Sequence, residues 1–296
     1  MNVKRTDLAF EAHEINAENG VDDGIVITEE TIDGIPVTVA VVKEGRGEKE
    51  AGKPAGTYIT ADIGRIWDAS GETFNSASKA LCSLLLRLLP TGSPCVLAAG
   101  LGNGEITADS VGPKVVSSLI ATRHIKSINS SLYSSLGFGE LCALAPGVLG
   151  QTGIESADIV RSVAQTVKPD CIIVIDALVS RRLERLATTV QISDTGIMPG
   201  SGVGSARSEL SLDTLGTKVI SVGVPTVVEA HTLVADLLEE AGADTGAAGR
   251  LSGDSLFVAP KESDVMTDSV SRLIAASINL AVHKGMKIEE MNEYLA

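Results

Sequence analysis

Aromatic residues are scarce in this chain: one Trp, three Tyr and four Phe make up 3% of its 296 residues. Platforms that stack nucleic-acid bases or sugars need exposed rings, so such platforms are not expected. Basic residues are also in the minority, because 24 Lys and Arg stand against 38 Asp and Glu, for a net charge of −14. That balance argues against direct binding of nucleic acid.

Long apolar segments are missing as well. The start, MNVKRTDLAFEAHEINAENG, lacks the continuous apolar run of a signal peptide. No stretch approaches the roughly 18 apolar residues of a membrane span. We therefore expect a cytoplasmic protein with no membrane partner. The four cysteines show no CxxC spacing and lie in apolar surroundings such as CIIVIDAL, which predicts buried free thiols rather than disulfides or a zinc site.

Hydrophobic residues make up 44% of the chain, and they recur with regular spacing. Short apolar runs at 95–99, 171–178 and 217–225 are typical of strands buried on both faces. Segments with a helical apolar pattern alternate with these runs, at 73–89, 114–125, 155–170, 228–240 and 264–284. This alternation predicts an α/β fold, with a largely parallel sheet and helices on both faces.

The N-terminal part follows a different pattern. GIVITEE (24–30) and GIPVTVAVVKEG (34–45) predict two strands joined by a short turn, and hence an added N-terminal antiparallel β patch. Residues 1–23 are polar and acidic, and they show no clean period. No linker is long enough to divide the chain, so residues 8–296 are expected to form a single domain.

Acidic residues stand at the ends of three predicted strands. Asp62 ends strand 58–61, Asp109 lies in the loop after strand 95–99, and Asp176 ends the apolar run that starts at 171. Reactive groups in open parallel sheets gather beyond the carboxyl ends of the strands. The ordinary alternative for each is a helix cap or a turn. Asp176 fits that alternative least, because ionisation in its apolar context is costly without a partner.

Two glycine-rich loops also follow predicted strands. GLGNGEITADSVGP (100–113) is a poor phosphate loop, because Glu105 occupies the place of the third Gly in GxGxxG and no GKS or GKT follows. SDTGIMPGSGVGSARSEL (193–210) is either a surface loop or a flap or anion-binding nest near the same sheet edge. A non-catalytic nucleotide- or anion-binding protein is therefore the alternative to an enzyme.

Common catalytic templates are missing, since the chain has no HExxH, no GxSxG and no Cys in a hydrophilic loop. His231 follows strand 217–225 and could join Asp109 and Asp176 in a divalent-metal site, with Glu229 nearby. These ligands would come from separate loops without diagnostic spacing. No cofactor is therefore expected, and the metal site is the alternative.

Several segments together carry a resemblance to a known family. They are RTDLAFEA (5–12), GLGNGEITADSVGP (100–113), IDALVSRRLERL (175–186) and QISDTGIMPGSGVGSARSELS (191–211), supported by VGVPTVVEA (222–230). In this order they resemble the germination proteases of spore-forming bacteria, which degrade small acid-soluble spore proteins. The resemblance implies a fold like that of hydrogenase maturation proteases, a homotetramer, synthesis as a zymogen, and a place in the cytoplasm of the spore or forespore.

The same resemblance implies that two aspartates, which match Asp109 and Asp176 here, are needed for cleavage. This agrees with their positions at strand ends. One carboxylate can act as general base on a water while a protonated partner polarises the scissile carbonyl, provided that proximity separates their pKa values. The resemblance by itself does not choose between this mechanism and a metal-dependent one.

The family resemblance also attaches an order to substrates: an acidic residue before the cut, a hydrophobic residue after it, and then Ala. Asp7, Leu8 and Ala9 reproduce that order in the chain's own N-terminus. We therefore predict self-processing between Asp7 and Leu8, with 1–7 as a short propeptide. Because terminal segments are often accessible to cleavage, this one is expected to be exposed and mobile.

Overall fold

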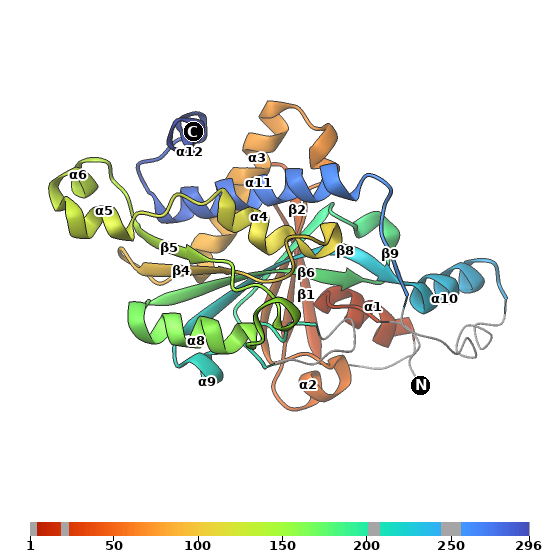
Figure 1. The fold of residues 1–296 in the computed structure, drawn as a ribbon. Helices are drawn as coiled ribbons and strands as arrows, with labels where there is room; N and C mark the ends of the chain where they lie inside the picture. Colours follow the sequence, from red (N-terminus) through yellow and green to blue (C-terminus); the bar gives the residue numbers. More distant parts are fainter. Residues whose placement is uncertain (1–4, 19–23, 201–207, 244–255, 296) are drawn as a thin grey trace.

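The computed structural model describes residues 5–18, 24–200, 208–243 and 256–295. Within them, nine strands form one sheet in the order β1-β2-β3-β7-β8-β6-β4-β5, and β9 pairs with β8 (Figure 1). The strands are β1 (Ile25–Ile32), β2 (Ile35–Val42), β3 (Gly56–Asp62), β4 (Cys95–Gly100), β5 (Glu140–Leu144), β6 (Cys171–Ser180), β7 (Thr189–Ser193), β8 (Lys218–Glu229) and β9 (Phe257–Val258).

The strands β5, β4, β6 and β8 are parallel neighbours, as the apolar runs predict. The predicted N-terminal patch is confirmed as the antiparallel set β1, β2 and β3. It is continuous with the parallel part, because β3 pairs with β7 and β7 pairs with β8, both antiparallel. Ile192 of β7 faces Ile59 on one side and Val222 on the other. The result is the mixed α/β fold expected from the sequence.

Helices cover both faces of this sheet (Figure 1). The helices α3, α4 and α11 lie on one face, and α8 lies on the other. The helices are α1 (Ala9–Glu18), α2 (Arg46–Ala51), α3 (Gly71–Leu88), α4 (Val111–Ser117), α5 (Arg123–Ile128), α6 (Ser130–Ser135), α7 (Leu149–Thr152), α8 (Ser156–Val167), α9 (Leu212–Leu215), α10 (Ala230–Glu240), α11 (Ser263–Val282) and α12 (Ile288–Leu295), with 3-10 turns η1 (Ile66–Asp68), η2 (Thr107–Asp109) and η3 (Leu183–Arg185).

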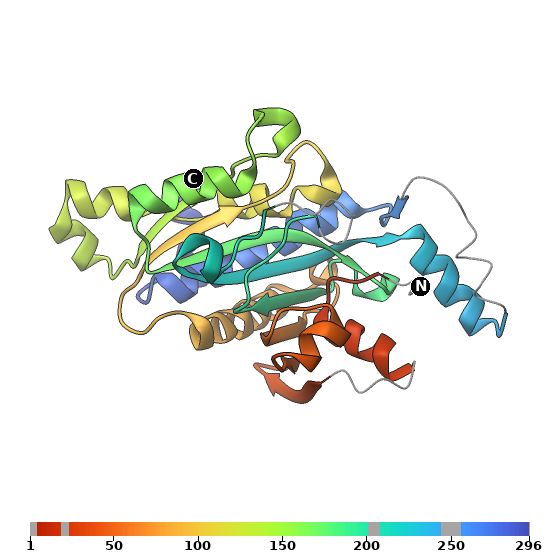
Figure 2. The same cartoon turned by 90° about the horizontal axis from the view of Figure 1, so that it is seen from below.

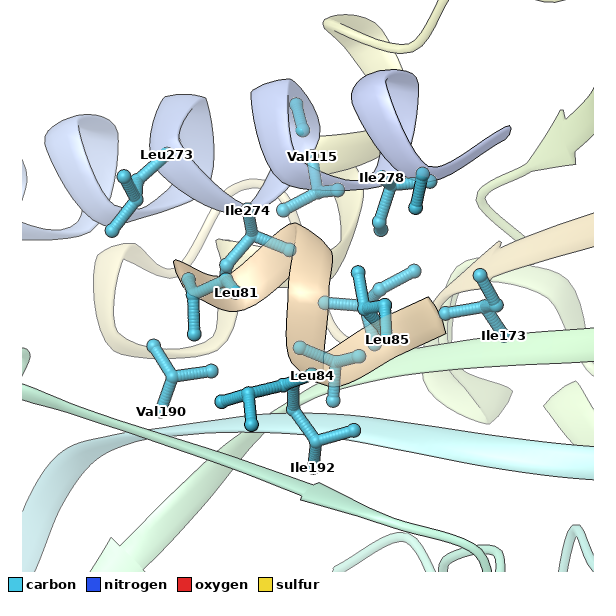
Figure 3. Close-up of a cluster of buried hydrophobic side chains, with 14 of the residues drawn as sticks. Leu81, Leu84, Leu85, Val115, Ile173, Val190, Ile192, Leu273, Ile274 and Ile278 are labelled. Carbon is cyan, nitrogen blue, oxygen red and sulfur yellow. The ribbon is translucent and has the colours of Figure 1, made fainter. Parts of the chain in front are cut away.

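The main core lies between the sheet and the helices α3 and α11 (Figure 3). Leu81, Leu84 and Leu85 of α3 are fully buried there. Leu81 lies beside Ile274 of α11, and Leu84 lies on the side of the sheet, near Ile192 of β7 (Figure 3). Each such side chain contributes about 1.5–3 kcal/mol on burial. By length and composition α11 could cross a membrane, but 78% of its apolar window is buried inside the protein. Its apolarity is therefore that of a core helix.

The apolar pattern of 114–125 predicts one helix, whereas the structure has two, α4 and α5. Two backbone N–H groups between them form hydrogen bonds with distant parts of the chain. The Ile120 N–H donates to Asn279 Oδ1 over 3.0 Å, and the Thr122 N–H donates to the Leu141 carbonyl over 2.9 Å. Tertiary hydrogen bonds thus override the local helical preference.

Helix α1 is not apparent in the sequence, because it buries consecutive residues rather than one face. Ion pairs hold it against the segment that follows β6. Arg181 binds Glu18 over 2.9 Å, and Arg185 lies 3.3 Å from Glu14 and stacks on the Phe10 ring, 3.9 Å from its centre. These contacts place the N-terminal segment beside the carboxyl end of β6 (Figure 2).

Candidate active site

Asp176 lies within β6, in register with Gly223 of β8, and is 6% exposed. The neighbouring strand β4 ends at the same level, since Gly100 pairs with Ile175. The Leu101 N–H then donates to the Ile175 carbonyl over 2.8 Å. The loop after β4 therefore begins directly beside Asp176, although β6 does not end at Asp176 as the sequence predicts but continues to Ser180 beside β8.

Asp109 is held by its own loop at the end of η2. Its Oδ2 accepts a hydrogen bond from the Asn103 N–H over 2.7 Å, and the Ala108 carbonyl accepts one from the Thr226 hydroxyl over 2.7 Å. Gly102 has φ +108°, and a Cβ there would lie 2.1 Å from the Asp109 carbonyl oxygen. This close contact accounts for Gly102 without a bound phosphate.

Asp109 and Asp176 line the same cavity of about 530 Å³, together with Asp7 from the N-terminal segment. The structure thus brings together both predicted catalytic residues and the predicted cleavage site.

The second glycine-rich loop borders this cavity. Its residues 195–200 and Glu209 line the wall, and Ile197 pairs with Leu210 through two backbone hydrogen bonds of 3.0 and 2.9 Å. Residues 201–207 lie outside the described part of the chain. The location favours the interpretation of a functional loop at the site over that of an unrelated surface loop.

Asp7 is anchored in the cavity by its backbone and its carboxylate. Its N–H donates to the Val179 carbonyl over 2.8 Å, and its Oδ2 accepts from the Val179 N–H over 2.9 Å. Its carbonyl oxygen accepts from Lys53 Nζ over 3.0 Å and from Gln191 Nε2 over 3.3 Å. Gln191 Oε1 also accepts from the Ala9 N–H over 2.8 Å. Hydrogen bonds therefore fix the residues on both sides of the Asp7–Leu8 peptide bond.

The expectation that the predicted cleavage site is exposed is wrong. Leu8 and Ala9 are both 0% exposed. They pack in an apolar cluster with Phe10, Tyr58 and Leu178, under the first turn of α1. The polar residues of the segment suggested exposure, but its apolar residues pack in this cluster.

His231 does not line the cavity. Its Nδ1 lies 3.9 Å from Glu229 Oε1, and the same carboxylate oxygen lies 3.4 Å from an Arg5 guanidinium nitrogen. In the described part of the chain, no group of three or more His, Cys, Asp and Glu residues could hold a metal ion. The structure therefore does not assemble the metal set of Asp109, Asp176 and His231.

Asp62 also lies outside this site. Its Oδ1 accepts from the Gly64 N–H over 3.1 Å, which is a turn contact at an exposed position. Asp62 thus follows the ordinary alternative of a turn carboxylate.

Lys53 and Gln191 were not identified as site residues in the sequence. Lys53 lies in a charged, glycine-rich loop with no diagnostic spacing, and Gln191 opens the 191–211 motif without a recognisable role. Burial lowers the pKa of the Lys53 ammonium, while the nearby carboxylates of Asp7 and Glu11 oppose that shift. Only the fold brings these two donors to one carbonyl oxygen.

The cysteines are free, as predicted, although Cys171 alone is fully buried and Cys82, Cys95 and Cys142 are half-buried. Burial raises the pKa of the Cys95 and Cys171 thiols to about 12 and that of Cys82 to about 11. A thiol is a nucleophile in its thiolate form. These thiols are therefore poorly suited to nucleophilic catalysis.

Comparison with known proteins agrees with the sequence resemblance. The family model described as germination protease matches residues 2–241. The germination protease of Clostridium acetobutylicum is 39% identical over 100% of both chains, and that of Caldanaerobacter subterraneus subsp. tengcongensis is 39% identical over 98% of both. The germination protease of Geobacillus sp. is 34% identical, over 98% of this chain and 96% of its own.

Among solved structures, the [NiFe] hydrogenase maturation protease HycI from Thermococcus kodakarensis matches with a TM-score of 0.37 and 15% identity, over 66% of this chain and 98% of that one. The assignment rests on the sequence relatives, which align from end to end. The chain belongs to the germination protease family of peptidases.

Proposed function

We propose that this protein is an endopeptidase that initiates the degradation of small acid-soluble spore proteins during germination, and that it is made as a zymogen which cuts itself between Asp7 and Leu8. One observation carries the proposal: Asp7, Asp109 and Asp176 line one cavity, in which two side-chain donors hold the Asp7 carbonyl oxygen. This position of Asp7 supports a substrate-like binding of the N-terminal segment.

In the proposed reaction Asp109 and Asp176 act as a pair that shares one proton. The ionised carboxylate takes a proton from a water, whose oxygen attacks the scissile carbonyl carbon. The protonated partner polarises the carbonyl oxygen. Collapse of the tetrahedral intermediate breaks the C–N bond, and the carboxyl group that took the proton from water gives it to the departing nitrogen. The products are a new carboxylate at Asp7 and a new amine at Leu8.

Lys53 and Gln191 supply the electrostatic part of this chemistry. Their donors already contact the oxygen on which negative charge develops, over 3.0 and 3.3 Å. Preorganised donors of this kind stabilise an oxyanion without reorganisation during the reaction. The charge on Lys53 strengthens its hydrogen bond.

The same contacts support a preference for acidic, hydrophobic and Ala residues around the cut. The Val179 N–H accommodates the carboxylate of Asp7. Leu8 fills an apolar cluster, and Ala9 is fully enclosed, so a larger residue there would clash. Removal of residues 1–7 would free the contacts of Asp7 for the acidic residue of a spore protein, while Leu8 and Ala9 stay with the chain.

Expectations about assembly, location, cofactors and DNA complete the proposal. The protein would act as a homotetramer in the cytoplasm of the spore or forespore, and Ile128 and Leu132, which are 80% and 46% exposed, offer apolar area for subunit contacts. It would need no cofactor, and its net charge of −14 would keep it from competing for the DNA that its substrates coat. Light scattering tests the tetramer, and metal analysis of active protein tests the absence of a metal cofactor. A gel shift tests the absence of DNA binding.

Intact mass of the full chain incubated at mildly acidic pH tests self-processing. We expect loss of residues 1–7, and we expect Asp7→Ala to block it, with Asp33→Ala as an exposed control. A mass that stays at full length while an acid-soluble spore protein is digested would refute the zymogen step. Failure to digest that substrate, together with a nucleotide-dependent rise in melting temperature, would favour the alternative of a nucleotide-binding protein.

A further inference from the structure

A hydroxyl links the predicted cleavage site to a buried carboxylate. The Leu8 N–H donates to Thr6 Oγ1 over 3.0 Å. The Thr6 hydroxyl in turn donates to Glu11 Oε2. Thr6 therefore lies between the nitrogen of the Asp7–Leu8 peptide and the Glu11 side chain, and it belongs to the segment that the proposed cut removes.

Glu11 is 0% exposed. Its Oε2 also accepts from the Arg181 N–H over 2.8 Å. Its Oε1 lies 3.0 Å from Arg185 Nε but makes no well-directed hydrogen bond, and Arg185 is shared with Glu14. Burial raises the pKa of the Glu11 carboxyl, against the opposing effects of Thr6, Arg181 and Arg185. Glu11 thus has room for a further donor.

The helix geometry places Glu11 where it can reach the Leu8 nitrogen. Helix α1 begins at Ala9, so Leu8 precedes its first residue and Glu11 is its third. In a capping box, a Glu at this third position accepts from the N–H of the residue before the helix. In the uncut chain the Thr6 hydroxyl lies between the Leu8 N–H and the Glu11 carboxylate.

Cleavage would change both partners of this contact. Hydrolysis converts the Leu8 amide nitrogen into an ammonium and releases Thr6 with the propeptide. An ammonium is unfavourable at a helix N-terminus because of the helix dipole, and costly beside a fully buried side chain unless an anion pairs with it. Glu11 is the carboxylate already joined to that nitrogen through one hydroxyl.

We propose that Glu11 is the binding site for the Leu8 α-ammonium that the cut creates, an inference that rests on the proposed function. The ammonium takes the place of the Thr6 hydroxyl on Glu11 Oε2. The new N-terminus is then fixed to α1 and kept from returning to the cavity, while Val179, Lys53 and Gln191 become available to a substrate.

The test uses chains that begin at Leu8 from the outset, so that self-cleavage is not needed. Such a chain is released from a fusion partner by a protease that leaves no extra residue, and a matched chain carries one additional Gly before Leu8. The extra residue moves the ammonium by about 3.8 Å. Both chains are also made with Glu11→Gln. Melting temperature and KM for a spore-protein peptide are measured.

We expect the added Gly to lower the melting temperature by about 5 °C or more, and to raise KM, when Glu11 is present. In the pair of chains with Glu11→Gln, the added Gly should change the melting temperature and KM little. An equal effect of Gly in both pairs, or none in either, would overturn the proposal. If Glu11→Gln does not fold, amine labelling of the two Glu11 chains decides: protection of the Leu8 amine relative to the Gly amine supports the site, and equal rates refute it. Self-processing is judged separately from the mass of the full chain, so the two hypotheses fail independently.

Discussion

Lys53 Nζ lies 3.0 Å from the carbonyl oxygen of Asp7. A loop before β3 thus reaches the peptide bond that the family resemblance marks for cleavage, at a cavity whose two aspartates come from β6 and from the loop after β4. Under the proposed function, the uncut chain is therefore the first substrate on which the specificity can be tested.

Replacing Asp109 or Asp176 with Asn should abolish self-processing and digestion of spore protein while leaving the fold intact, because each change removes a proton-transfer group at nearly constant volume. The double variant should be no worse than either single one, since residues that act as a unit fail together. Asp62→Asn, at an exposed turn, is the control. Near-full turnover in a folded Asp109 or Asp176 variant would reject the dyad.

Lys53→Met should slow the cut between Asp7 and Leu8 by roughly 10²–10³-fold, the effect of removing one oxyanion donor. The rate is read from intact mass over time, with circular dichroism as a check on folding. Lys49→Met removes an exposed Lys from α2 and should leave the rate unchanged. Equal rates for the two variants would mean that Lys53 holds the segment without aiding the reaction.

Leu84→Ala should destabilise the protein by about 2–5 kcal/mol, because its side chain is fully buried between α3 and the sheet and truncation leaves a cavity. Leu86→Ala on the same helix removes a side chain that is 49% exposed and should cost much less. Denaturant unfolding of the two variants measures the difference. Similar losses for both would contradict the packing described for α3.

His283 should make the protein less stable as the pH falls. It is fully buried, its Nδ1 accepts from the Gly139 N–H over 3.2 Å, and its Nε2 lies 3.0 Å from the Ile120 carbonyl. Burial lowers the pKa of His283 below the ordinary value of 6.5. The unfolded chain therefore binds the proton first, and stability falls as the pH drops from about 6.5 towards the lowered pKa.

Melting temperature against pH checks this expectation. His283→Gln can keep both hydrogen bonds without titrating, so its stability should fall less steeply on acidification. His124→Gln, at an exposed position on α5, should follow the parent protein. A parent and a His283→Gln variant with parallel pH profiles would show that this histidine does not contribute.

Several features of the molecule follow from local patterns in the sequence. The apolar runs of β4, β6 and β8 predict buried parallel strands, because only strands covered on both faces are apolar throughout. Parallel strands then bring their carboxyl ends to one edge, which is why Asp109 and Asp176 were candidates, together with Asp62, before the cavity was known. The choice of the first two as a catalytic pair came from the family resemblance. The Asp7-Leu8-Ala9 order was equally visible, although only as a resemblance.

The tertiary structure alone decided how the cleavage site is held. Lys53 and Gln191 meet at the Asp7 carbonyl from segments far apart in the chain, and Arg181 and Arg185 hold α1 from the far end of β6. No periodicity records such contacts, since each is a single side chain placed by the packing of other elements. For the same reason Leu8 was expected to be exposed and is buried: burial depends on what the fold lays over a residue, whereas the local sequence carries only its polarity.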